Sequence, residues 1–241
     1  MLSVLPDTLT RLNPPDHSFE GFSEDAFAVL EALRQAPHVE AYRREKARID
    51  AAVMGPFRRY RDDLVVNSVL PSSLPWETEK NVFSRLLKND FGAGGCHHHI
   101  WLSFYRMGRR SLTDPQLVHS LDPDGFTVGL YAGDHYGDYF ARLKARVASE
   151  PTVFASLLSE LLGTPGFHAY AYTGGGASEA RHDVPDADAA VALLPRARGF
   201  WVRTRVAPPD VLTLGPSLVP RALDAVDAVW SLYRYYAEAA E

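Results

Sequence analysis

The sequence predicts an α+β protein with a mainly antiparallel sheet and helices packed on one face. The middle of the chain alternates apolar and polar residues in short runs that tight turns connect, and short turns join antiparallel neighbours. Both ends instead carry apolar residues at helical spacing. This order, with helices before a run of strands and mixed elements after it, is typical of the α+β class.

The N-terminal segment predicts an extended arm over residues 1–22, because it contains Pro6, Pro14 and Pro15 and no clear period. A single α+β domain is then expected over residues 23–241. Its first helix is "SEDAFAVLEALRQAP", in which Ser23 suits the N-cap position and two acidic residues follow in the first turn.

A second helix is expected over residues 38–70, with a kink or break at Gly55-Pro56 because proline lacks the N–H that a helix interior needs. Its basic residues alternate with acidic ones, which favours a solvated helix face over a phosphate-binding face. These basic residues are Arg43, Arg44, Lys46, Arg48, Arg58, Arg59 and Arg61.

Four strands are predicted after a loop, over residues 81–89, 97–105, 115–121 and 126–133. The last two form a hairpin around "DPDG", where proline and glycine suit a tight turn. With the turn centred on Pro123 and Asp124, six alternating residues share one face. They are Leu117, His119, Leu121, Phe126, Val128 and Leu130.

The C-terminal third predicts helices over 134–150 and 151–163, a strand over 166–173 and a loop over 174–185. A short helix over 186–198, a strand over 199–207 and a closing helix over 216–241 follow. The closing helix has an apolar stripe at helical spacing, formed by Leu223, Val226, Trp230 and Tyr233.

The composition limits the classes of function and the cellular locations that fit this chain. A net charge of -5 argues against a free-standing nucleic-acid binder, because phosphate neutralisation supplies most of that affinity, although a local basic patch remains compatible. The one cysteine excludes an internal disulfide and indicates a reducing compartment. No signal-peptide pattern opens the sequence, and no apolar run approaches the ~20 residues of a membrane helix. We expect a cytoplasmic protein without a membrane partner.

The stretch "FEGFSEDAFAVLEALRQAPHVEAYRREKARIDAAVMGPFRRY" resembles the bacterial family named domain of unknown function 2461. Members open with an F-x-G-F-style entry to a helix, matched by Phe19, Gly21 and Phe22. A second helix then ends in a proline-containing turn, matched by residues 42–56.

A central R-x-x-x-D-x-R-F-like segment of that family corresponds to "SRLLKNDFGAGG". Arg85 and Phe91 match, but the second arginine of the family is missing. The segment "CHHH", residues 96–99, stands where the family has a basic P-Y-K-like stretch.

The stretches "DPQLVHSLDPDGFTVGLYAG" and "VWSLYRYY" are similar to a related version at the N-terminus of McrB-like ATPases of restriction systems. Together the two resemblances cover residues 18–162 and, more weakly, the C-terminal end. They imply a non-catalytic recognition or adaptor module of a bacterial cytoplasmic system, in a setting such as defence, beside a larger machine such as an ATPase.

The segment "CHHHIWLSFY" raises an alternative, a metal-dependent enzyme. Alternate residues of a strand share a face, so His97 and His99 point one way while Cys96 and His98 point the other. The pair offers two ligands to a divalent transition metal, but catalytic zinc needs a third from the protein. The sequence does not place His135, His168 or His182, the possible donors. His119 falls on the apolar face of the hairpin, where it could meet His98 instead. Structural or polar histidines are therefore preferred.

Cys96 is a second candidate for chemistry. A nucleophilic thiol needs a lowered pKa and an oriented base, and adjacent strand residues such as His97 point away from it. A small buried cysteine is the preferred interpretation.

Three arginines, Arg106, Arg109 and Arg110, are expected at a tip between two strands and are candidate anion-binding residues. A role in solubility alone is preferred, and nucleic acid is not the favoured partner. The loop at 174–176 lacks the glycine spacing that cradles phosphate and is kept as a candidate binding edge of open role.

Overall fold

A curved antiparallel sheet organises the chain. The computed structural model describes residues 5–88, 95–109, 113–134, 138–175 and 178–240. Within these residues seven strands pair in the order β1-β2-β3-β4-β7-β5-β6, and all neighbours are antiparallel. The strands are β1 (Trp76–Glu77), β2 (Ile100–Arg106), β3 (Gln116–Asp122), β4 (Gly125–Gly133), β5 (Phe167–Thr173), β6 (Ala180–Val184) and β7 (Ala197–Val206).

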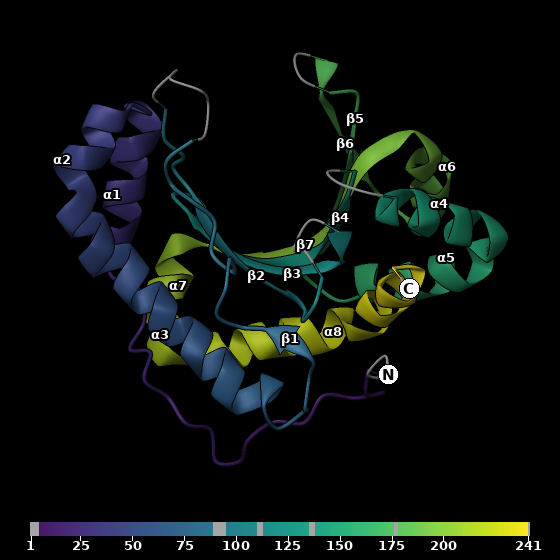
Figure 1. The fold of residues 1–241 in the computed structure, drawn as a ribbon, viewed down its shortest axis with the longest axis horizontal. Coiled ribbons are helices and arrows are strands. Elements are labelled where there is room, and N and C mark those ends of the chain that lie inside the picture. Colours follow the sequence, from purple (N-terminus) through teal and green to yellow (C-terminus); the bar gives the residue numbers. More distant parts are fainter. Residues whose placement is uncertain (1–4, 89–94, 110–112, 135–137, 176–177, 241) are drawn as a thin grey trace.

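The helices surround the outer side of this sheet. They are α1 (Glu24–Gln35), α2 (Val39–Ile49), α3 (Gly55–Leu64), α4 (Tyr139–Ser149), α5 (Pro151–Leu162), α6 (Ala187–Leu193), α7 (Pro208–Leu214) and α8 (Leu218–Ala239). Figure 1 shows the sheet bent into a trough, with α1 to α3 outside one wall, α7 and α8 beneath the floor, and α4 to α6 outside the other wall. The helices of the described chain therefore cover one face, which confirms the predicted fold class.

The hairpin predicted around "DPDG" is confirmed. Leu117 pairs with Leu130, and Leu121 pairs with Phe126, in register across β3 and β4. All four side chains are buried on the helix-covered face. The matched alternation fixes this register, because a slip by one residue would turn every apolar side chain away from the core.

The helix over residues 38–70 passes Gly55-Pro56 without a break. A π-helical turn over Asp50–Met54 connects α2 to α3, and the Gly55 N–H donates to the carbonyl of Asp50, five residues back. The wider turn provides room for the proline ring, which would otherwise collide with a carbonyl of the preceding turn. The expected break is therefore wrong, although the regular α-helix is interrupted at Ile49, just before Gly55-Pro56. The interleaved charges pair at the surface as expected, for example Lys46 with Asp50 at 2.5 Å.

Three elements differ from the expected loops. The short strand β1 lies in the loop before the predicted strands, β6 lies inside the segment predicted as a loop over 174–185, and α7 was not predicted. Most residues of β6 are exposed or half-buried at the edge of the sheet, so the segment carries little apolar alternation. Residues 81–89 were predicted as a strand, and their described part forms only isolated bridges, from Phe83 to Leu102 and from Leu87 to Cys96.

The described part of the N-terminal segment, residues 5–22, contains no helix or strand but is bound along its length. The indole N–H of Trp230 on α8 donates to the Pro6 carbonyl at 2.9 Å. Farther along, the backbone N–H groups of Ser18 and Phe19 donate to the carboxylate of Asp63 on α3. The Phe19 ring is buried, so this segment ends in the core.

A membrane-crossing helix would have to be both long and apolar, and no helix among the described residues is.

Candidate binding surface on the concave face of the sheet

The inner face of the trough presents three rows of side chains. Register partners in an antiparallel sheet share a face, so each row runs across neighbouring strands. The first row is Trp101, Ser120, Thr127 and Arg205; the second is Ser103, Val118, Gly129, Arg203 and His168; the third is Gln116, Tyr131, Trp201, Tyr170 and Asp183. We call these rows together the concave face.

The second row contains small residues on its β2, β3 and β4 side, and its packing depends on Gly129. A Cβ atom at this position would lie 2.4 Å from the Val202 carbonyl oxygen and 2.6 Å from the Cβ of Arg203. Only glycine allows β4 and β7 to approach so closely at this point. Because Gly129 has no side chain, no atoms project from β4 beside Arg203 at this position.

Aromatic rings line the wall on the β4 and β7 side. The centroids of Tyr131 and Trp201 lie 4.7 Å apart, and both side chains are half-buried. A Cβ atom at Gly133 would lie 2.1 Å from the Tyr131 hydroxyl oxygen, and one at Gly199 would lie 3.0 Å from it. The phenol therefore extends over two positions that lack side chains, which keeps it close to the backbone of the sheet.

Tyr170 supports two cations on the same face. The guanidinium of Arg181 lies 4.1 Å from its ring centroid and that of Arg203 lies 4.7 Å from it, both within the range of a cation–π interaction. The Tyr170 ring is buried, and burial raises the pKa of its hydroxyl to about 12. The phenol is therefore neutral near pH 7 and offers its ring to the arginines.

Arg203 is the least compensated of these cations. Arg181 also forms an ion pair with Asp183 at 2.9 Å, whereas no carboxylate in the described chain pairs with Arg203. Burial lowers the pKa of Arg203, and the positive charges of Arg205 and Arg181 lower it further. A half-buried cation beside like charges is stabilised when an anion binds to it.

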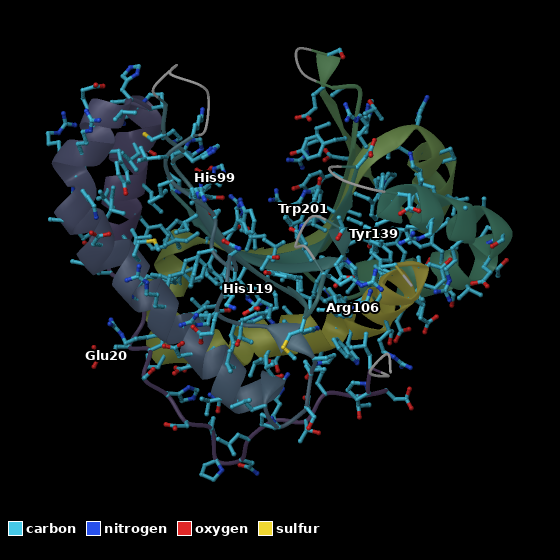
Figure 2. The ribbon with its side chains drawn as sticks, viewed as in Figure 1. Glu20, His99, Arg106, His119, Tyr139 and Trp201 are labelled. Atoms are coloured by element: carbon cyan, nitrogen blue, oxygen red, sulfur yellow. The ribbon has the colours of Figure 1, made fainter. Side chains whose placement is uncertain are left out.

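The facing wall holds a pocket of about 500 Å³. Its lining residues are Ser84, Arg85, Leu87, Lys88, His97, His99 and Trp101. Figure 2 labels His99 on this wall and Trp201 on the other, with the trough between them. Burial lowers the pKa of His99 to about 4, with further contributions from His97 and His98, so its imidazole is neutral near pH 7.

His97 and His99 lie together, with ring centroids 4.9 Å apart, and His98 also lies beside His99 at 5.5 Å. The strand β2 begins only at Ile100, so the alternation predicted for a strand does not hold for these three residues. Among the described residues no group of three His, Cys, Asp or Glu side chains is arranged to hold a metal. His168 lies on β5, and His182 on β6 hydrogen-bonds to Thr173 at 2.8 Å. His135 lies outside the described residues.

His119 does not meet His98. Its Nδ1 atom lies 2.8 Å from the hydroxyl oxygen of Tyr60 on α3, on the helix-covered side of the sheet (Figure 2). Cys96 is buried, and its Sγ atom lies 3.6 Å from the His38 carbonyl oxygen. Burial raises the pKa of this thiol, which disfavours the thiolate and fits the preferred structural role.

Arg106 is not at an exposed basic tip, and its assignment as an anion-binding residue needs correction. It is 7% exposed, and its Nη2 atom lies 2.6 Å from a carboxylate oxygen of the buried Asp114. It also donates to the carbonyl of Ala237, while Arg109 donates to that of Ala240. Both arginines therefore attach the C-terminal end of α8, where cations are favourable. Arg110 lies outside the described residues.

Gly174 and Gly175 precede β6, and Gly176 lies outside the described residues. A Cβ atom at Gly175 would lie 2.2 Å from a guanidinium nitrogen of Arg198, so this arginine crosses the glycine closely.

The fold and the surface define an α+β protein with an open, concave antiparallel sheet. No protein-family model matches the chain, and no curated protein matches it at a significant level. The concave face itself is therefore the basis for assigning a function. The sequence interpretation singled out none of Tyr131, Tyr170, Trp201 and Arg203. The alternation in "FWVRTRV" was the available signal, since it places Trp201, Arg203 and Arg205 on one face.

Proposed function

We propose that this protein is a non-catalytic recognition module that binds an anionic ligand with flat groups on the concave face. The observation that carries the proposal is Arg203, a half-buried guanidinium stacked on Tyr170 without a carboxylate partner in the described chain. Holding such a charge costs free energy that a bound anion offsets. The rings of Tyr131, Trp201 and Tyr170 form a row beside Arg203, with centroids 4.7 and 6.2 Å apart, which gives the same ligand an apolar aromatic neighbour.

His168, the register partner of Arg203, and Asp183 lie on the same face. Binding without catalysis fits the groups in contact with Tyr170, which are two guanidiniums, and its own phenol, whose pKa of about 12 keeps it protonated near pH 7. Such groups hold and orient a ligand, whereas general acid–base catalysis works best with a pKa near the working pH. The resemblance to the family of unknown function, and to the ATPase-linked version, adds the setting that we propose: an adaptor in a bacterial cytoplasmic system, beside a larger machine such as an ATPase.

A metal-dependent enzyme is the second candidate, favoured by the adjacent rings of His97 and His99 in the pocket of about 500 Å³. Elemental analysis of the purified protein separates the two functions. A stoichiometric transition metal that is lost on replacing both histidines would support the enzyme.

The recognition proposal is tested by thermal melts with three probes: adenosine monophosphate, adenosine and inorganic pyrophosphate. Only the monophosphate combines a flat ring with an anion, so we expect it to raise the melting temperature most. Arg203→Gln should abolish this rise. Arg221→Gln is the matched control, because Arg221 is an exposed arginine on α8, outside the sheet. An equal rise for wild type and Arg203→Gln would contradict the proposal.

A further inference from the structure

We infer that the ligand of the concave face is a single strand of nucleic acid, an inference that rests on the proposed function and specifies its ligand. Unpaired bases expose flat faces that stack on aromatic side chains, while their phosphates meet cations beside those rings. The concave face supplies both kinds of group on two facing walls.

Two groups of residues could each contact one part of the strand, and we call each group a station. The first station is on the wall with Trp201. The half-buried rings of Trp201 and Tyr131 stand on adjacent strands at 4.7 Å between centroids, and Tyr170 stacks on Trp201 from the next strand at 6.2 Å. A base can meet the exposed part of this aromatic row. Arg203 follows two residues after Trp201 on the same face of β7, about 7 Å along the strand. Its guanidinium stacks on Tyr170 and has no carboxylate partner in the described chain, so its N–H donors face no competing ion pair there when a phosphate arrives.

The second station lies on the opposite wall, in the pocket of about 500 Å³. Trp101 supplies a half-buried indole there, and the exposed Arg85 and Lys88 supply positive charge. Trp101 also belongs to the first row, which runs through Ser120 and Thr127 to Arg205 on β7. One continuous face therefore connects the two stations.

This duplication distinguishes a polymer from a small molecule. A mononucleotide fills one station, whereas a chain of nucleotides reaches both Trp201 on β7 and Trp101 on β2, three strands away in the same sheet. A duplex keeps its base faces stacked inside, so it gains nothing from the aromatic rings. The net charge of -5 limits general attraction to polyanions. The binding affinity should therefore come mainly from base stacking and from the local arginines.

Fluorescence anisotropy with labelled oligothymidylate and oligouridylate tests the inference. A length of about 12 nucleotides lies within the ~4–16 that single-strand-binding folds cover. Trp201→Ala and Trp101→Ala should each weaken binding roughly tenfold, since each variant loses the stacking of one base. Trp201→Phe keeps a ring and should retain most of the affinity, which separates lost stacking from misfolding. A thermal melt checks that each variant is folded.

Different outcomes distinguish a failure of the single-strand inference from a failure of the proposed function. If adenosine monophosphate binds through Arg203 but the single strand binds no tighter, the proposed function stands and this inference is overturned. Equal affinity for duplex DNA or for an acidic polyglutamate peptide also overturns it, as does an unchanged affinity in Trp101→Ala. If Arg203→Gln affects none of the probes, the proposed function fails as well.

Discussion

The guanidinium of Arg203 lies 4.7 Å from the centroid of the Tyr170 ring, on the open face of the sheet. Arg106, in contrast, is held by the carboxylate of Asp114 on the helix-covered side of the molecule. Both side chains belong to strands of one sheet, but one cation lacks a carboxylate partner in the described chain and the other has a buried one. The difference gives the two residues opposite roles, the first in binding and the second in stability.

Replacing each arginine by methionine separates these roles. Arg203→Met should leave the free energy of unfolding unchanged or slightly higher, because it removes a half-buried charge that forms no ion pair with a described residue. Arg106→Met should lower it by about 3–5 kcal/mol, because the buried Asp114 loses its partner. Urea denaturation measures both values. A loss in Arg203→Met as large as that in Arg106→Met would refute the assignment.

Gly129 should tolerate no side chain. The Cβ atom of Gly129→Ala would meet the Val202 backbone at 2.4 Å, and backbone moves less easily than the end of a side chain. We expect the free energy of unfolding to fall by about 1–3 kcal/mol, the usual cost of overpacking. Gly163→Ala is the control, since its Cβ would meet the nearest atoms at an ordinary 3.4 Å. Equal stability of the two variants in thermal melts would be inconsistent with the close approach of β4 and β7.

His119 should make stability depend on pH in the acidic range. Burial lowers its folded-state pKa from 6.5 to about 3, so between these values the unfolded chain binds a proton that the folded chain does not. The contribution is complete above about pH 6.5 and is lost as the pH falls toward 3, at up to about 1.4 kcal/mol per pH unit.

His119→Gln tests this dependence, because glutamine hydrogen-bonds to Tyr60 without titrating. The difference between wild type and variant isolates His119 from the other acid-sensitive groups, including His99. Unfolding free energies that decline in parallel from pH 6.5 downward would show that His119 does not carry the effect.

The His97 and His99 pair should bind a divalent metal only weakly. Two imidazoles without a third described ligand leave most of the coordination shell to water. We expect a chelator to leave the melting temperature of the wild type unchanged, and the double alanine variant to melt at nearly the same temperature. If the chelator lowers the wild-type value by many degrees, and the double variant is already that low, the pair belongs to a true metal site.

Local patterns in the sequence were enough to predict the fold class, the hairpin around "DPDG" and the closing helix α8. The alternation of Leu117 and Leu121 and the turn residues act over a few neighbours, so their consequence can be derived without knowing the rest of the chain. His97 and His99 do lie together, but outside any strand and with His98 also beside His99, so strand alternation does not explain their positions. The strand β6 was missed because an exposed edge strand has little apolar alternation, and only its pairing with β5 makes it a strand.

The candidate binding surface was decided by the tertiary structure. Alternation in β7 places Trp201 and Arg203 on one face, but it does not say which face the helices cover. That depends on where α8 and its neighbours pack, through contacts between residues far apart in the sequence. The same packing buries Arg106 against Asp114 and Ala237, although its position at a strand end suggested exposure. The sequence alone gives the charge and the aromatic content. Which face of the sheet stays open is decided only when the helices pack against the opposite face.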